Sequence, residues 1–242
     1  MQRLLVCGVF FAITILLAGC LEATKVPTQD LPVSPPWQAP ESLEYELLDR
    51  NDGEEVGMGT LEVAAEQEGR YELAQRFRND EDFDNSLVVV DAETLKPISG
   101  SRDRLVDGER VQLTSQYDAT ENTVTITEIE EDGEARVIPH RLERNYYDND
   151  SSLFLWRSIP FAEGFEASYY TVVTGSGEQH IVHIEVVRKE RITVPAGTFE
   201  TWRLEIEGTD RKQVAWYADT PQHPLVQYDN SVQFFRLVTT PE

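Results

Sequence analysis

Apolar and polar residues alternate with a period of two over most of the chain, and this alternation restricts the possible folds more than any other feature. In one stretch, Trp202, Leu204 and Ile206 alternate with Arg203 and Glu205. Successive side chains of a β-strand point to opposite faces of the sheet, so the pattern predicts strands with one buried face and one exposed face. Similar stretches cover residues 43–49, 57–65, 71–77, 86–91, 111–117, 122–129, 134–138, 166–174, 180–190, 202–207, 212–218, 224–229 and 232–239.

Short clusters of turn-forming residues separate these stretches, for example Asn-Asp-Gly at 51–53 and Gly-Ser-Gly at 175–177. Such short connections join antiparallel neighbours. One helix is expected at 151–157, where Asp150 can cap the first turn and Pro160 stops propagation. Because helices do not alternate with the strands, parallel α/β folds are excluded. We predict a mainly all-β chain that forms a single antiparallel, strongly curved sheet or open barrel with one short helix.

The N-terminus has the layout of a secretory signal followed by a lipid attachment point. Residues 4–17 form an apolar run that is too short to span a bilayer comfortably, and the run ends in Leu17-Ala18-Gly19-Cys20. This tetrapeptide resembles the bacterial lipobox, which implies a signal peptide over residues 1–19 and a diacylglycerol with a further palmitate-type chain on Cys20. The alternatives are an uncleaved anchor helix, or a cysteine that happens to end an ordinary signal.

The next segment, residues 20–42, is rich in proline and poor in apolar residues. We expect a lipidated cysteine and an extended tether, or else packing of residues 31–39 along the domain with Trp37 buried. Residues 43–242 then form a single β-rich domain. Because Leu21 rather than Asp follows the cysteine, the predicted location is the outer membrane of the cell envelope, or the outer face of the cytoplasmic membrane in a cell with one membrane.

The charge of the chain excludes one class of partner. It carries 44 acidic and 21 basic residues, which gives a formal net charge of -23. Nucleic acid binding requires a basic surface, so nucleic acid is not expected as a partner. An acidic body is also repelled by anionic headgroups, so we expect the folded domain to stand away from the bilayer.

Three segments resemble the signature of bacterial envelope domains of unknown function. They are residues 192–204, which contain Val-Pro-Ala-Gly-Thr-Phe, the later Trp-Tyr-Ala at 216–218, and Asp-Ala-Glu-Thr-Leu-Lys-Pro at 91–97. The resemblance implies an architecture like the open, curved sheets of periplasmic lipoprotein carriers, in which an unclosed barrel wraps an apolar hollow. On physical grounds alone, Pro195 and Gly197 mark a turn in which Gly197 adopts a backbone conformation that other residues disfavour.

Motifs for catalysis and metal binding are not found in the sequence. It has no Gly-x-Ser-x-Gly elbow and no Gly-rich phosphate loop. His180 and His183 fall on opposite faces of a strand, and the acidic loop that begins at Asp80 has Asn85 where a calcium loop requires glycine. We therefore expect a protein that is not an enzyme and that has no cofactor and no metal site.

The function we expect is binding of a hydrophobic or amphipathic ligand, such as a lipid, by a membrane-anchored envelope lipoprotein. The candidate ligand-lining residues are Trp202, Trp216 and Tyr169, with their rings facing the interior of the sheet. Two alternatives remain: an assembly protein with a filled core that docks another envelope protein, and a hydrolase with an acidic site. A pocket of several hundred cubic ångströms would favour ligand binding, and a filled core would favour docking.

Overall fold

The computed structural model describes residues 26–129, 134–208 and 211–239. Within these residues the chain forms fifteen strands and one short helix, α1 (Ser152–Arg157), which follows a 3-10 turn at Asn149–Ser151. The strands are β1 (Glu41–Asp49), β2 (Glu55–Val63), β3 (Arg70–Arg78), β4 (Phe83–Asp91), β5 (Pro97–Val106), β6 (Glu109–Asp118), β7 (Thr123–Ile129), β8 (Ala135–Arg141), β9 (Tyr146–Asp148), β10 (Glu166–Val173), β11 (Glu178–Val194), β12 (Gly197–Glu207), β13 (Lys212–Ala218), β14 (Leu225–Asp229) and β15 (Gln233–Leu237).

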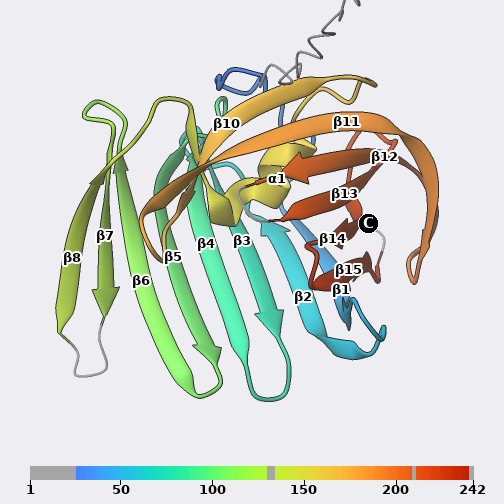
Figure 1. The fold of residues 1–242 in the computed structure, drawn as a ribbon, viewed down its shortest axis with the longest axis horizontal. Coiled ribbons are helices and arrows are strands. Elements are labelled where there is room, and N and C mark those ends of the chain that lie inside the picture. The colour runs from blue at the N-terminus through green and yellow to red at the C-terminus, as the bar shows by residue number, and fades with distance from the viewer. Residues whose placement is uncertain (1–25, 130–133, 209–210, 240–242) are drawn as a thin grey trace, which may run out of the picture.

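All fifteen strands belong to one sheet, in the order β8-β7-β6-β5-β4-β3-β2-β1-β15-β14-β13-β12-β11-β10-β9. Except for β8 and β9, which form the two ends of the sheet, each strand lies beside its neighbours in the chain. The pairing of β1 with β15 joins the two arms of the sheet, β1–β8 and β9–β15. Only β9 and β10 run parallel among the described strands. The predicted fold class is confirmed: the sheet is mainly antiparallel, strongly curved and not closed by hydrogen bonds between β8 and β9 (Figure 1).

The two ends of the sheet overlap through side chains. Tyr146 of β9 and Val172 of β10 form one apolar cluster with Tyr117 of β6 and Val124 of β7. The turn after β10 lies so close to β8 that a Cβ atom on Gly177 would approach the His140 ring to 2.2 Å. The sheet is therefore rolled, with the β9–β10 end packed against the β6–β8 end.

The helix α1 fills the inside of the roll, and all six of its residues are buried. Tyr217 of β13 donates a hydrogen bond to the Leu153 carbonyl at 2.7 Å, and Trp156 donates one to the Tyr169 hydroxyl at 2.9 Å. A helix this short is stable only through such tertiary contacts. Its predicted position is confirmed, but the predicted cap is wrong: Asp148, not Asp150, accepts the capping hydrogen bond, because the 3-10 turn starts the helical segment two residues earlier.

Residues 31–39 pack on the domain, as in the second of the two alternatives for this segment. Leu31 and Trp37 are 5% and 7% exposed. The Leu31 amide donates to the Tyr147 hydroxyl at 3.0 Å, and the Trp37 ring meets the ring of Phe154 edge-on. The folded body thus includes residues upstream of position 43, because burial of these two side chains completes the core around α1.

Gly197 has the unusual backbone conformation that the sequence predicts. The β11–β12 turn pairs Val194 with Gly197, whose φ is +136°. We expect Gly197→Val to lower the free energy of unfolding by about 1–3 kcal/mol, because L residues rarely adopt this conformation. A denaturant titration measures the effect. Gly175→Val is the matched control, since Gly175 also has open space around it but an ordinary φ, and equal losses in the two variants would contradict the argument.

The predicted site of lipid attachment, Cys20, lies outside the described part of the chain. Within the described part, no helix has the length and apolarity that a membrane crossing requires.

Candidate functional site

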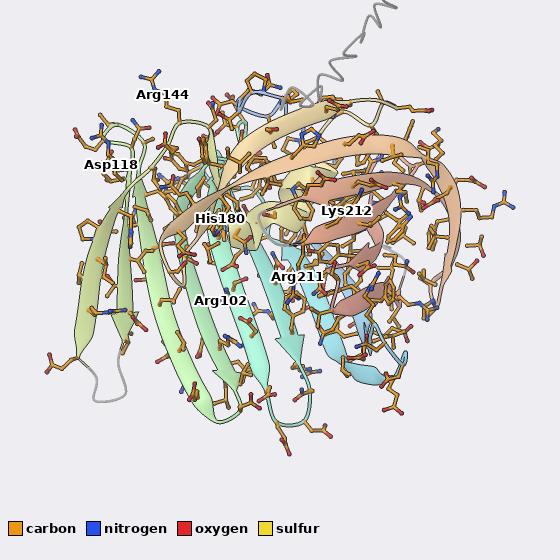
Figure 2. All side chains as sticks on the ribbon, viewed as in Figure 1. Arg102, Asp118, Arg144, His180, Arg211 and Lys212 are labelled. Atoms are coloured by element: carbon orange, nitrogen blue, oxygen red, sulfur yellow. The ribbon has the colours of Figure 1, made fainter. Side chains whose placement is uncertain are left out.

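A hollow of about 380 Å³ lies beneath α1, between the two arms of the rolled sheet. Figure 2 labels Arg102 and Arg211, which lie below α1 in this view. The apolar part of the lining of the hollow consists of Phe77, Leu153, Trp156, Val182, Ile206, Tyr228, Val232 and Phe235. The polar part consists of Gln75, Arg102, Asn149, Asp150, Ser152, Arg211, Gln213 and Asn230, with Gly208 at the edge.

Four aromatic rings form a continuous wall on one side of the hollow. Phe77 meets Phe235 edge-on at 5.2 Å between ring centroids, Phe235 lies 5.3 Å from Tyr228, and Tyr228 lies 6.1 Å from Trp156. These residues come from β3, β15, β14 and α1, and the alternation along each strand directs them inward. The wall offers apolar surface that a ligand could cover.

Arg102 of β5 is held rigidly at the polar side of the hollow. Its Nε and Nη2 donate to the two carboxylate oxygens of Asp84 at 2.8 and 2.6 Å, and its Nη1 lies 3.5 Å from Asp150. The hydrogen bonds to Asp84 raise the pKa of the Arg102 guanidinium further, so it stays charged. Gln75 donates to the Asp150 carbonyl and fixes the opposite side of this group.

A buried carboxylate lies directly behind this polar group. Asp148 is fully buried, and its two oxygens accept the Tyr117 hydroxyl at 2.6 Å and the Asp150 amide at 2.8 Å. Burial, with repulsion from the Asp150 carboxylate, raises the pKa of Asp148. Nearby, the Ser115 hydroxyl is buried without a hydrogen-bond partner among the described residues. This cluster joins the start of the helical segment to β6.

The three residues predicted to line a ligand do not line this hollow. Tyr169 is fully buried behind Trp156, and burial raises the pKa of its hydroxyl to about 12. Trp202 pairs with Tyr217 across the sheet, whereas Trp216 pairs with Arg203. Because directly paired residues share a face, Trp202 and Trp216 lie on opposite faces of the sheet, and the prediction that both rings face the interior is wrong.

The surroundings of each tryptophan explain these positions. Tyr217, next to Trp216, takes the core position on β13. Trp216 is covered on the other face by the Arg203 guanidinium, 5.4 Å from its ring, and donates to Glu190. Trp202 packs at the margin of the core and donates to Asp219 at 2.9 Å. Neither ring therefore reaches the hollow.

Sequence reasoning missed Trp156 and Arg102 as site residues. Trp156 lies within the helix expected at 151–157, and nothing in the sequence marks its ring as part of a site. Arg102 lies on β5, whose sequence around Gly100, Arg102 and Arg104 lacks apolar alternation and was not recognised as a strand. Within the described residues, no three His, Cys, Asp or Glu side chains come together in a group that could hold a metal ion.

Comparison with known protein families assigns the chain to one of them. The model of a family described as proteins of unknown function, DUF3108, matches residues 43–234. The chain belongs to the DUF3108 family.

Two solved structures are similar to this DUF3108 chain. The first is a β-barrel-like protein of the DUF1849 domain of unknown function from Brucella abortus, with a TM-score of 0.48, 10% identity, and coverage of 83% of this chain and 96% of that one. The second, from Bacteroides fragilis, has a YmcC-like fold; its TM-score is 0.29, its identity is 13%, and the coverage is 90% of this chain and 98% of that one. No curated protein sequence matches this chain.

Proposed function

We propose that this DUF3108 protein is a membrane-anchored envelope lipoprotein that binds an amphipathic ligand in the hollow beneath α1, without catalysis. The observation that carries the proposal is the aromatic wall of Phe77, Phe235, Tyr228 and Trp156 beside a polar side that includes the fixed charge of Arg102. A ligand with an apolar chain and a polar headgroup matches both sides at once.

The size and composition of the hollow support a small ligand. A volume of about 380 Å³ lies within the usual range of small-molecule sites, which is about 300–1,000 Å³. Covering the aromatic wall with an alkyl chain removes apolar surface from water and favours binding. The headgroup would lie toward Arg211, Gln213 and Asn230, which line the hollow together.

The arrangement of carboxylates gives less support to a hydrolase. An acidic glycosidase site needs two carboxyl groups that face each other across a cleft. Among the described lining residues, Asp150 is the only carboxylate, and it lies against Arg102. The docking alternative has one observation in its favour, since the core around α1 is filled by side chains. The test below therefore has to separate binding in the hollow from docking.

The membrane anchor is the second part of the proposal. Cys20→Ser is expected to release the protein from membranes, because two or three acyl chains on Cys20 supply the anchoring energy. The released variant is the whole exported chain in soluble form, and it is the material for the binding test.

Saturable binding of a fluorescent fatty acid to the Cys20→Ser variant, with a change in tryptophan emission, is the expected result. Val182→Phe in this background should weaken binding at least about tenfold, because the added ring occupies the hollow next to the aromatic wall. The measurement is a titration of probe fluorescence.

The neighbouring residue offers a matched control. Ile181 lies on the same strand but faces away from the hollow and is 45% exposed, so Ile181→Phe should bind the probe like the parent. Equal binding by the two phenylalanine variants, or failure of every single-chain amphiphile to saturate, would contradict ligand binding in the hollow and favour docking.

A further inference from the structure

The segment between the predicted anchor and the sheet is bound to the domain from its first described residues. Thr28 forms a bridge with Ser168 of β10, and the Gln29 amide donates to the Ser168 carbonyl at 2.9 Å. The Asn145 side chain donates to the Thr28 carbonyl at 3.0 Å. We call residues 26–30 the brace, because they fix the start of the chain to the β9–β10 edge of the sheet.

A partly buried lysine clamps the brace. The ammonium of Lys96 lies 2.5 Å from the carboxylate of Asp30, donates to the Tyr146 carbonyl at 3.0 Å, and sits 4.0 Å from the centre of the Tyr147 ring. The Lys96 side chain is only 24% exposed. An ammonium that contacts a carboxylate and an aromatic face while partly desolvated is held more tightly than an exposed surface pair.

The position of the brace leaves little free chain for the anchor. Five residues separate Cys20 from Val26. Six residue steps reach about 20 Å when fully extended. A lipid on Cys20 would therefore keep the brace, and with it the β9–β10 edge, within about 20 Å of the headgroups.

The hollow lies away from the brace, and its lining residue Val232, which is 44% exposed, marks its mouth. A row of paired residues crosses the sheet from the brace: Thr28 pairs with Ser168, Ser168 with His183, and His183 with Glu207. Three strand spacings of about 4.8 Å place Glu207 about 14 Å from Thr28. The next residue, Gly208, already lines the hollow, and Figure 2 shows Arg211 well separated from the blue N-terminal segment.

We infer that the brace holds the β9–β10 edge toward the anchoring bilayer and turns the mouth of the hollow away from it, so that a ligand enters from the aqueous compartment and not from the anchoring bilayer. The inference rests on the anchored, ligand-binding function proposed above. Because residues 26–30 are attached to the sheet, they are not a free tether, and the domain has a fixed orientation relative to the bilayer.

Depth-dependent quenching on vesicles tests this orientation. The mature chain has no cysteine after the lipidated Cys20, so one added cysteine gives a single labelling site. Arg144→Cys places a thiol-reactive fluorophore next to Asn145 and the brace, and Val232→Cys places it at the mouth of the hollow. The full-length lipidated protein is reconstituted in phosphatidylcholine vesicles that contain a lipid with a nitroxide on its headgroup. We expect quenching at position 144 to exceed quenching at position 232 at least threefold.

Lys189, elsewhere in the fold, provides a matched control for Lys96. Lys189 also lies 2.5 Å from a carboxylate, that of Asp219, and sits over an aromatic ring, that of Trp202, at 4.5 Å. Lys96→Met should lower the ratio of the two quenching values at least twofold by loosening the brace, and Lys189→Met should leave it unchanged. Equal quenching at positions 144 and 232 in the parent, or a ratio that Lys96→Met does not change, would overturn the inference.

Two further results distinguish failure of this inference from failure of the proposed function. Release of the lipidated protein from the vesicles by a salt wash would overturn the anchor and the orientation together. If the protein stays bound and the Val182→Phe and Ile181→Phe variants differ in probe binding, equal quenching at the two labels would overturn the orientation alone.

Discussion

Glu41→Gln is expected to lower the free energy of unfolding by about 3–5 kcal/mol. Arg157 of α1 and Glu41 of β1 have side chains that are only 3% and 8% exposed, and two contacts of 2.5 and 3.0 Å join them. The substitution keeps the shape of the side chain but leaves the guanidinium buried without its opposite charge. The midpoint and slope of urea unfolding measure the loss.

An exposed ion pair of the same kind provides the control. Arg191 and Glu200 pair across β11 and β12 with side chains that are 72% and 53% exposed, so Glu200→Gln should cost less than about 1 kcal/mol. The double variant Glu41→Leu/Arg157→Met should recover much of the loss, because it removes both buried charges and keeps apolar volume. Similar losses in the Glu41 and Glu200 variants would mean that burial does not control the energy of this pair.

The second large effect is a dependence of stability on pH that arises from Asp148. Burial and repulsion from Asp150 raise the pKa of Asp148 to about 7 in the folded protein, whereas an aspartate in an unfolded chain has a pKa of about 3.9. Between about pH 4 and pH 7, the folded state therefore holds a proton that the unfolded state has released. Stability consequently falls as the pH rises through this window, by up to about 4 kcal/mol, and this contribution changes no further above pH 7.

Asp148→Asn should remove most of this dependence, although burial also raises the pKa of the neighbouring Asp150. The amide resembles the protonated carboxyl group and can still bond to the Tyr117 hydroxyl and the Asp150 amide. We expect the variant to melt at a higher temperature than the parent at pH 8 and near the parent at pH 5. Asp80→Asn, at an exposed position, should follow the parent at both pH values. If the Asp148→Asn variant keeps the full pH dependence of the parent's stability, that dependence arises from other groups.

The sequence predicted which faces of the strands are buried, but not which residues meet in the candidate site. Alternation over residues 43–49, 71–77 and 111–117 predicts strands with one buried face, and Tyr45, Phe77 and Tyr117 of these stretches lie in or against the apolar clusters. It did not predict that the wall of the hollow combines residues from β3, α1, β14 and β15. Side chains that are distant in the sequence become neighbours only when the sheet rolls, and no local pattern records the angle of that roll.

The aromatic residues of β13 show where a period-two pattern stops being informative. Trp216 and Tyr217 are adjacent, so only one of them can face the core, and both are apolar enough to do so. The structure places Tyr217 in the core, where its hydroxyl meets the Leu153 carbonyl of α1, and covers Trp216 with Arg203. That choice depends on a hydrogen-bond acceptor on another element, which the alternation cannot reveal.

The sequence by itself determined the local features of this protein: the alternating strands, the position of the short helix at 152–157, and the turn at Gly197 with its positive φ. Each of these depends on side-chain periodicity or on the steric limits of a few consecutive residues. Only the tertiary structure decided that Leu31 and Trp37 belong to the core, that the two ends of the sheet overlap, and that a hollow remains beneath α1. These features depend on how much apolar surface distant segments bury against one another, and that quantity exists only once the chain has folded.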